Sequence, residues 1–284
     1  NKKGINIALV ISHKKTSKEK YFKNLKFLAK KLNLRCISPT NINSKIVKDK
    51  LKIIKPDLMI LCGYSQNILK KKIFEIPKYG SWNLHASDLP KYRGASPLNW
   101  ALINNESKIG ISIIQVDKSL DGGDIIAKAF INIKKKENIK SLTYKVNKLY
   151  PKLLFKQILK LKKGSIVKKK QNSKKATYFT RRLPKDSHLK FNFFTADEIK
   201  RIINASVYPY PAAFFYYNKK KIEIGSEADV IKNYFGIPGR IIKRDSCSIT
   251  VICKKNSIRL KEIFYNNKLV NPIKQNLKPG KNLH

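Results

Sequence analysis

The chain has few acidic residues, few cysteines and no long run of apolar residues. No apolar stretch approaches the roughly 18 to 20 residues that a membrane-spanning helix needs. The apolar run over 5–11 lacks the small-residue cleavage site of a signal peptide and is typical of a strand. We therefore expect a cytoplasmic protein without membrane insertion.

Only four cysteines are present, and no pair of them has C-x-x-C spacing. Structural zinc sites generally need such closely spaced thiolates, so the sequence predicts no metal centre. Each cysteine lies in or beside an apolar, strand-like run. We expect buried free thiols in a reducing compartment at Cys36, Cys62, Cys247 and Cys253.

Arginine is scarce among the basic residues, with eight of the 62 Lys and Arg, while Asp and Glu number 18 and the net charge is +44. Such a charge suggests a nucleic-acid partner. The lysines, however, are spread from end to end, and arginine is the residue that makes bidentate phosphate and base contacts. Lys, Asn and Ile dominate together, as an AT-rich coding sequence would impose. Solvated lysine faces are therefore favoured over RNA binding, although the charge still suits a polyanionic substrate.

The first half of the chain alternates apolar strands with amphipathic helices, which predicts an α/β domain over 1–163 with a mostly parallel, doubly wound sheet. Strands are expected at 5–11, 34–37, 57–62, 80–84, 109–116 and 124–132. Helices are expected at 18–33, 43–54, 68–75, 97–103 and 138–163.

The second half divides into a Lys-rich linker over 164–193 and a small β-rich domain over 194–284. Short strands between turns predict a small barrel or open sheet behind one helix. The helix is expected at 195–205 and the strands at 212–217, 220–224, 238–243, 247–253 and 256–263. The end of the tail 264–284 is expected to be poorly ordered.

A polar pair ends one of the predicted strands, at Asn83 and His85. Residues i and i+2 of a strand point to the same face, so Trp82 and Leu84 would face the core. An amide and an imidazole, with a carboxylate from a separate loop, can stabilise an oxyanion and transfer a proton. Taken singly, His85 would be an ordinary core or surface histidine and Asn83 a strand-end cap. The sequence from Asp121 to Asp124, taken by itself, is an ordinary turn.

Together, these residues resemble the formyltransferases that use N10-formyltetrahydrofolate. The resemblance rests on Asn83-x-His85-x-Ser87-x-Leu89-Pro90, Tyr92-Arg93-Gly94, Pro97 and Leu120-Asp121-Gly122-Gly123-Asp124-Ile125. It extends over nearly the whole chain through Gly63–Leu69, Arg181-Arg182-x-Pro184-x-Asp186 and Tyr208-Pro209-Tyr210-Pro211.

The resemblance implies a Rossmann-like formyltransferase domain followed by an OB-like domain, with formyl transfer as the activity. It implies that Asn83, His85 and Asp121 are catalytic and that N10-formyltetrahydrofolate is the co-substrate, without a metal. The residues that it places at the folate site are Gln66, Asn67, Ile68, Ser87, Asp88, Leu89, Pro90, Asp117, Lys118, Ser119 and Leu120.

The sequence leaves two possible acceptors of the formyl group. The segments Pro97-Leu98-Asn99-Trp100 and Arg181-Arg182-x-Pro184 are more similar to sugar-nucleotide formyltransferases, such as the domain that formylates UDP-4-amino-4-deoxy-L-arabinose. We therefore expect an amino-sugar nucleotide, with initiator methionyl-tRNA as the alternative, which the high charge would suit. Glycinamide ribonucleotide formyltransferase is disfavoured because those enzymes lack this second domain. The sequence predicts no particular oligomeric state.

Three departures from the family pattern remain. Asp88 stands where the family commonly has Leu, and Ala95 stands where the arabinose-type enzymes have Arg. These two changes keep open a third interpretation, an inactive folate- or RNA-binding relative. Family members also begin with a strand and a helix before the segment that 5–11 matches, and this chain begins with Asn. We therefore expect that strand and helix to be missing here.

Overall fold

The computed structural model describes residues 4–12, 25–63 and 69–283. Its contacts divide the chain into two compact units. The first unit comprises 1–93, 110–130 and 149–178. The second comprises 94–109, 131–148 and 179–284. Each unit is described by itself.

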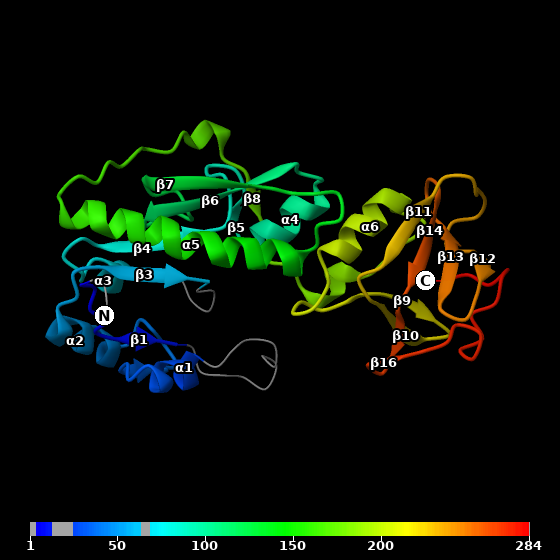
Figure 1. Ribbon diagram of the computed structural model, residues 1–284, viewed down its shortest axis with the longest axis horizontal. Coiled ribbons are helices and arrows are strands. Elements are labelled where there is room, and N and C mark those ends of the chain that lie inside the picture. The colour runs from blue at the N-terminus through cyan, green and yellow to red at the C-terminus, as the bar shows by residue number, and fades with distance from the viewer. Residues whose placement is uncertain (1–3, 13–24, 64–68, 284) are drawn as a thin grey trace. The chain divides into compact units, whose positions relative to one another are not determined.

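The first unit is built around a four-stranded sheet in the order β3-β4-β6-β7 (Figure 1). Its strands are β3 (Met59–Cys62), β4 (Ser81–His85), β6 (Lys108–Gln115) and β7 (Ile125–Asn132). Strands β3 and β4 pair in parallel, whereas β4 and β6 are antiparallel. The sheet is therefore mixed, with its parallel part before β6. Two further short strands, β1 (Val10–Ile11) and β2 (Cys36–Ile37), form a parallel pair of their own.

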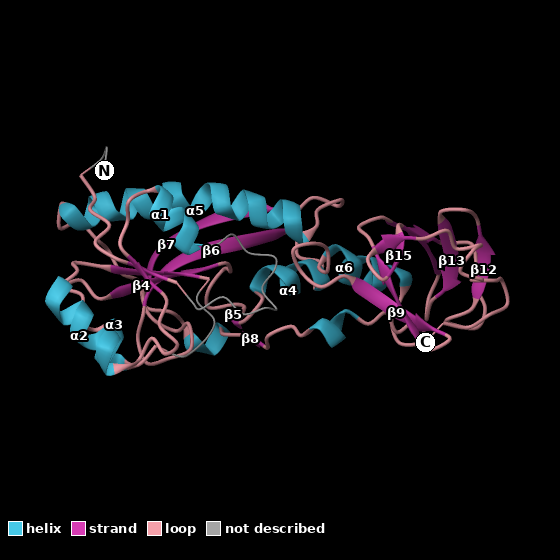
Figure 2. Cartoon of the chain, turned by 90° about the horizontal axis from the view of Figure 1, so that it is seen from below, coloured by secondary structure: helices cyan, strands magenta, loops and turns pink. Residues whose placement is uncertain are grey.

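Helices cover both faces of this sheet (Figure 2). The helices are α1 (Leu25–Lys31), α2 (Lys45–Ile54), α3 (Lys71–Phe74) and, from residue 149 on, α5 (Ile139–Lys162). One apolar cluster joins α2 and α3 to the sheet through Val47, Leu51 and Ile73. Leu153 and Ile158 of α5 pack against a second cluster, on the opposite face. Because the partly buried Met59 and Ile60 of β3 pack against the first and the second cluster, respectively, packing on two sides explains its continuous apolar run.

Several predicted elements are shorter than expected. Residues 5–9 are not in a strand, because β1 pairs only with β2 and only over two residues. The helix expected at 68–75 is reduced to α3, which ends just before Pro77, and residue 68 lies outside the described residues. The helix expected at 18–33 corresponds to α1, with residues 18–24 outside the described part of the chain.

The second unit contains two four-stranded sheets, β16-β15-β10-β9 and β11-β14-β13-β12. The strands are β9 (Ala213–Tyr217), β10 (Lys220–Ile224), β11 (Ala228–Ile231), β12 (Ile241–Arg244), β13 (Ser248–Ile252), β14 (Ser257–Lys261), β15 (Ile263–Tyr265) and β16 (Lys268–Leu269). Its helices are α4 (Pro97–Ile103) and α6 (Ala196–Asn204). Thr195 and Glu198 form a capping box at the start of α6, as the Thr-x-x-Glu spacing favours. Ile199, Ile202 and Ile203 of α6 then enter the core of this unit.

Short elements lie between these larger ones. They are β5 (Arg93–Gly94), β8 (Tyr178–Phe179) and the 3-10 turns η1 (Ser173–Lys175) and η2 (Pro184–Ser187). Strands β5 and β8 pair with each other. The sequence pattern predicts neither, because two residues are too few to show an alternation.

The expectation of a poorly ordered tail is wrong for the described residues. Leu277 is fully buried and Leu283 is 5% exposed, and both belong to the core of the second unit. The backbone N–H of Leu283 donates to the carbonyl of Gly239. The five residues between these leucines are Lys, Pro, Gly, Lys and Asn, so no run of alternating apolar residues indicates a buried segment here.

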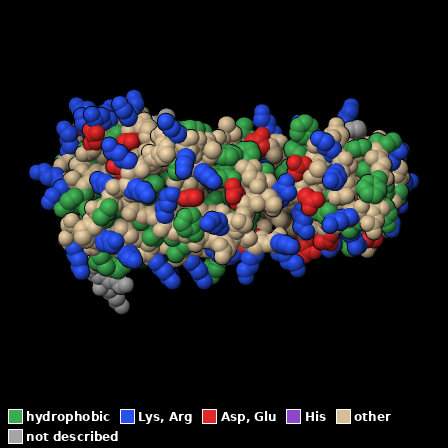
Figure 3. Space-filling view, turned by 90° about the horizontal axis from the view of Figure 1, so that it is seen from above, with side chains coloured by type: hydrophobic (Ala, Val, Ile, Leu, Met, Phe, Trp, Pro, Cys, Tyr) green, Lys and Arg blue, Asp and Glu red, His purple; other side chains and the backbone are tan. Residues whose placement is uncertain are grey.

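Basic side chains are scattered over the visible face of the molecule, with acidic ones among them (Figure 3). Among the described residues, no helix combines the length and apolar character needed to cross a membrane. All four cysteines are free, but only Cys253 is buried. The expectation of burial is therefore wrong for Cys62, the last residue of β3, and for Cys247, the residue before β13, because both are exposed.

Candidate active site

Strand β4 presents its polar and apolar side chains to opposite faces, as the sequence predicts. Trp82 is 1% exposed and packs with Ile113, and Leu84 packs against the same cluster. Asn83 and His85 therefore share the other face, at the carboxyl end of the strand. Both belong to the first unit.

The carboxylate of Asp121 contacts both side chains of this pair. Asn83 Nδ2 donates a hydrogen bond to Asp121 Oδ1 at 3.2 Å. His85 Nδ1 lies 3.6 Å from Asp121 Oδ2, with side-chain exposures of 7% for His85 and 13% for Asp121. The structure thus brings together the three residues for which the sequence predicts catalysis, with the His85 and Asp121 side chains largely shielded from solvent.

The loop that carries Asp121 requires its two glycines. A Cβ atom on Gly123 would lie 1.8 Å from the carbonyl oxygen of Gln115, and one on Gly122 would lie 2.4 Å from Ser119 Oγ. Asp121 itself has a φ of 50°, a left-handed conformation that Asp tolerates better than most residues. The glycines therefore allow the close approach that aims the Asp121 carboxylate at Asn83 and His85.

The second ring nitrogen of His85 has a backbone partner. Nε2 lies 2.8 Å from the carbonyl oxygen of Tyr92. A carbonyl only accepts hydrogen bonds, so Nε2 carries the hydrogen and donates. The other ring nitrogen, Nδ1, faces Asp121. Nδ1 is therefore the atom placed to take up or release a proton. Tyr92 presents its carbonyl from a left-handed conformation, with a φ of 59°.

The segment expected at the folate site directly after His85 is tightly folded. Ser87 is fully buried and its hydroxyl donates to the carbonyl of Lys91 at 2.9 Å. Leu89 is also fully buried, and the Leu89–Pro90 peptide is cis. Asp88 forms an ion pair with Lys128, with Nζ and Oδ1 2.7 Å apart. The Asp88 carboxylate therefore has a counter-charge within the same unit.

Four further residues expected at the folate site, over 117–120, lie on a loop. Asp117 Oδ1 accepts hydrogen bonds from the backbone N–H and the hydroxyl of Ser119, and Lys118 lies between them. Leu120 is 57% exposed, directly before Asp121. Gln66, Asn67 and Ile68 lie outside the described residues. A role in folate binding stays a prediction for the whole set.

Sequence reasoning assigned no role to two buried or partly buried polar residues beside this site. Arg93 is 3% exposed, and its Nη2 donates to Gln171 Oε1 at 2.8 Å. Gln171 Nε2 in turn donates to the carbonyls of Asp121 and Gly123. In the sequence, Arg93 stands out only as part of the Tyr92-Arg93-Gly94 motif. Gln171 lies in the Lys-rich stretch 164–193, which is expected to be a linker.

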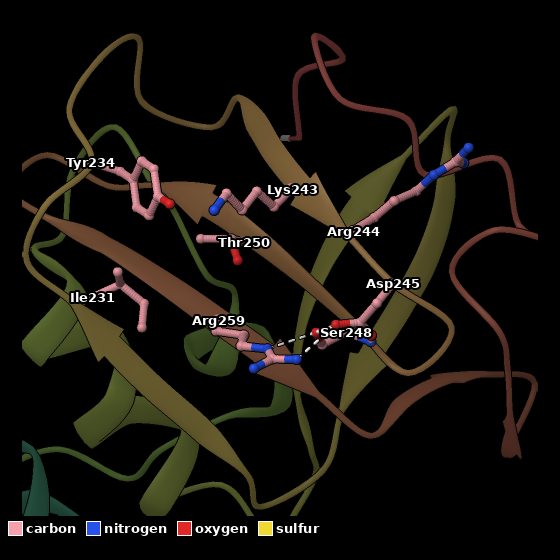
Figure 4. A pocket seen from close by; sticks show the side chains of 8 residues that line it. All are labelled: Ile231, Tyr234, Lys243, Arg244, Asp245, Ser248, Thr250 and Arg259. Atoms are coloured by element: carbon pink, nitrogen blue, oxygen red, sulfur yellow. Dashed lines mark hydrogen bonds and ion pairs between the residues drawn. The ribbon is translucent and has the colours of Figure 1, made fainter.

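A separate cavity of about 370 Å³ lies on the second sheet of the other unit (Figure 4). Its lining residues are Ile231, Tyr234, Lys243, Arg244, Asp245, Ser248, Thr250 and Arg259. Arg259 is paired with Asp245, with Nη2 and Oδ2 2.7 Å apart. None of the site residues predicted from the sequence lines this cavity. In the described part of the chain, no three His, Cys, Asp or Glu side chains are grouped so that they could hold a metal ion.

Comparisons with known proteins cover nearly the whole chain. The family model for formyl transferase matches residues 1–158, and the model for the formyl transferase C-terminal domain matches 183–278. The chain is 36% identical over 273 residues to the bifunctional polymyxin resistance protein ArnA of Wigglesworthia glossinidia brevipalpis. That match covers 93% of this chain and 40% of the relative.

Methionyl-tRNA formyltransferases are similar as well. The protein of that name from Caldanaerobacter subterraneus subsp. tengcongensis is 31% identical over 243 residues, which is 85% of this chain and 77% of the relative. The structure of methionyl-tRNA formyltransferase from Clostridium thermocellum is 27% identical, with a TM-score of 0.55, and the match covers 86% of this chain and 98% of that one. These findings confirm the expected fold and enzyme class: the chain belongs to the formyl transferase family.

Proposed function

We propose that this chain transfers the formyl group of N10-formyltetrahydrofolate to a primary amine, with Asn83, His85 and Asp121 as the catalytic residues. The observation that carries the proposal is the contact of one carboxylate with both an amide donor and an imidazole at the end of β4. Oxyanion donors and a proton acceptor are what acyl transfer to an amine requires.

The reaction has two steps at one carbon. The acceptor nitrogen attacks the formyl carbonyl carbon, and the carbonyl oxygen becomes an oxyanion of a tetrahedral intermediate. The bond between that carbon and N10 then breaks, N10 takes up a proton, and the acceptor nitrogen loses one. The oxyanion receives a hydrogen bond from Asn83 Nδ2, and His85 Nδ1 moves the proton, with its imidazolium form stabilised by Asp121.

For the acceptor, we propose an amino-sugar nucleotide. Two sequence segments support it, over 97–100 and 181–184, and they contact each other in the second unit. The Arg182 guanidinium lies 6.0 Å from the centre of the Trp100 ring. Trp100 Nε1 also donates to the carbonyl of Thr180 at 2.9 Å. Methionyl-tRNA remains the second candidate, supported by the methionyl-tRNA formyltransferases among the relatives and by the net charge of +44.

The test is a formyl-transfer assay with purified protein and N10-formyltetrahydrofolate. Charged initiator tRNA and a panel of amino-sugar nucleotides serve as separate acceptors, and mass spectrometry detects the formylated product. We expect turnover with a sugar nucleotide and none with the tRNA. Turnover with the tRNA alone would exclude the proposed acceptor but leave the reaction type in place.

The His85→Ala variant tests the mechanism in the same assay. Removing one oxyanion donor costs roughly 10²–10³ in kcat in other enzymes, and we expect a loss of at least that size because the proton carrier is removed too. His188→Ala is a matched control, because His188 stacks on Phe214 in the other unit, far along the chain from this site. Absence of turnover by the wild-type protein with every acceptor would instead favour an inactive, binding relative.

A further inference from the structure

The segment over residues 169–178, expected from its composition to be a linker, touches the active site at two places. It lies in the same unit as Asn83, His85 and Asp121. At its start, the backbones of Lys169 and Ile125 exchange two hydrogen bonds of 2.8 Å, which anchors it beside the first residue of β7. The segment then passes along the Asp121 loop and ends beside Tyr92 and Arg93.

Gln171 holds the loop that presents the catalytic carboxylate. Its Nε2 donates to the carbonyl of Asp121 at 2.8 Å and to that of Gly123 at 2.7 Å. Both hydrogens of the amide are therefore used on the two residues whose backbone sets the direction of the Asp121 side chain. The left-handed conformation of Asp121 is sparsely populated, so it persists only where neighbouring contacts stabilise it.

Arg93 fixes the amide of Gln171 in turn. Nε and Nη2 of Arg93 both donate to Gln171 Oε1, at 3.2 and 2.8 Å. Nη1 donates to the hydroxyl of Tyr178 at 2.8 Å, at the far end of the same segment. Because Arg93 is 3% exposed, these bonds face little competition from water. Arg93 thus fixes Gln171 Oε1 in place. The amide nitrogen Nε2 then points toward the carbonyls of Asp121 and Gly123.

Thr177 positions Tyr92, whose carbonyl accepts the hydrogen bond from His85 Nε2. Its Oγ1 accepts from the backbone N–H of Tyr92 at 2.9 Å, and its carbonyl accepts from Arg93 N at 2.8 Å. These bonds flank the Tyr92 carbonyl, which receives the hydrogen of His85 Nε2. One segment therefore supports both the carboxylate that faces Nδ1 of His85 and the carbonyl that faces Nε2.

We propose that Gln171 and Thr177 are positioning residues for formyl transfer, with Gln171 orienting Asp121 and Thr177 orienting the Tyr92 carbonyl that sets the His85 tautomer. This inference rests on the proposed function, since it concerns the same three catalytic residues. Neither positioning residue needs to touch the substrates. Their loss therefore lowers kcat and leaves the KM values for folate and amine nearly unchanged, because the geometry of the reacting groups is altered and the substrate contacts are not.

The sharpest variant is Gln171→Glu. It keeps an oxygen acceptor for Arg93 and the volume of the side chain, but it replaces the amide that donates to the Asp121 and Gly123 carbonyls with a carboxylate that cannot donate. We expect kcat to fall roughly 10²-fold, the scale of a displacement of about 1 Å in an active site, with KM within about threefold of wild type. The matched control is Asn172→Ala: the side-chain oxygen of Asn172 accepts from the backbone N–H of Lys174 within the segment itself, so kcat should be unchanged.

The second variant is Thr177→Val, which keeps the side-chain shape and removes the acceptor for Tyr92 N–H. It should also lower kcat with KM retained, and it decides the question if Gln171→Glu does not fold. Spectra of protein labelled with ¹⁵N-histidine separate the two effects. Gln171→Glu should shift the Nδ1 signal of His85, and Thr177→Val should shift the Nε2 signal, with His188 in the second unit unaffected by either.

The outcomes are distinguishable from failure of the proposed function. If His85→Ala turns over as fast as wild type, the catalytic assignment itself is wrong. If His85→Ala is inactive but Gln171→Glu and Thr177→Val retain wild-type kcat, the catalytic assignment stands and the positioning role is overturned. A kcat loss in Asn172→Ala equal to that in Gln171→Glu would also overturn it, because the effect would then be a general one on the segment.

Discussion

The carboxylate of Asp88 and the ammonium of Lys128 form an ion pair, with Oδ1 and Nζ 2.7 Å apart. The Lys128 ammonium also donates to the carbonyl of Leu89. Asp88 is the acidic residue that replaces the family's usual Leu beside the expected folate site. Its pairing with Lys128 explains how the chain carries a carboxylate there without presenting an isolated negative charge to a co-substrate that is itself anionic.

The first prediction follows from this pair. Lys128→Met frees the Asp88 charge and should raise the KM for N10-formyltetrahydrofolate by up to about fivefold, since an exposed charge pair is worth about 0.2–1 kcal/mol. Steady-state kinetics at varied folate concentration measures it. The double variant Lys128→Met with Asp88→Leu should recover the wild-type KM. An unchanged KM in the single variant would show that Asp88 has no electrostatic effect on the co-substrate.

The second prediction concerns the charge of Asp121. Asp121→Asn keeps the side-chain shape but removes the carboxylate that faces His85 Nδ1 at 3.6 Å. We expect kcat to fall roughly 10²–10⁴-fold, the range that general acid–base catalysis contributes. Asp124→Asn is the control, because this second acidic residue of the same turn bonds to Gln115 through its backbone carbonyl. Equal losses in the two variants would argue against a specific role for Asp121.

The third prediction tests the packing of the Asp121 loop. A Cβ atom on Gly123 would overlap the carbonyl of Gln115, so Gly123→Ala must move the loop. We expect it to lower the free energy of unfolding by about 1–3 kcal/mol and kcat roughly tenfold or more. Urea unfolding and kinetics measure the two effects. Gly164→Ala should also lose stability, because Gly164 has a φ of 66°, but kcat should be retained since nothing lies near its added methyl group.

The fourth prediction concerns stability against acid in the second unit. Hydrogen bonds from the Ser248 hydroxyl and the Cys247 N–H, together with Arg259, hold the pKa of Asp245 well below its ordinary value of 3.8. The folded state therefore binds this proton less readily than the unfolded state. The stabilisation is fully present above pH 3.8 and is lost as the pH falls below it, toward the lowered pKa.

Asp245→Asn should accordingly unfold at a lower urea concentration than wild type at about pH 7, and the difference should shrink below about pH 3. A gap for Asp245→Asn that stays constant with pH would mean that the substitution acts through packing rather than through the charge.

Much of the fold could be predicted from local patterns. The boundaries of α4 and β10 match the sequence prediction at every residue, because Pro97 begins the helix and a two-residue Asn218-Lys219 turn limits the strand. The opposite facing of Trp82 and Asn83 followed from strand geometry alone. Elements of two or three residues, such as β5 and β8, carry no periodicity, and they form because distant segments pair.

The sequence by itself determined the family, the strand that presents Asn83 and His85, and the loop that carries Asp121. Those features depend on residue type at short spacing, where backbone geometry dictates the outcome. Only the tertiary structure decided that Lys128 neutralises Asp88, that Tyr92 sets the hydrogen on His85, and that Gln171 holds the Asp121 loop. These contacts join residues 7 to 50 positions apart in the chain, and the folding of the backbone, rather than any local spacing, brings them together.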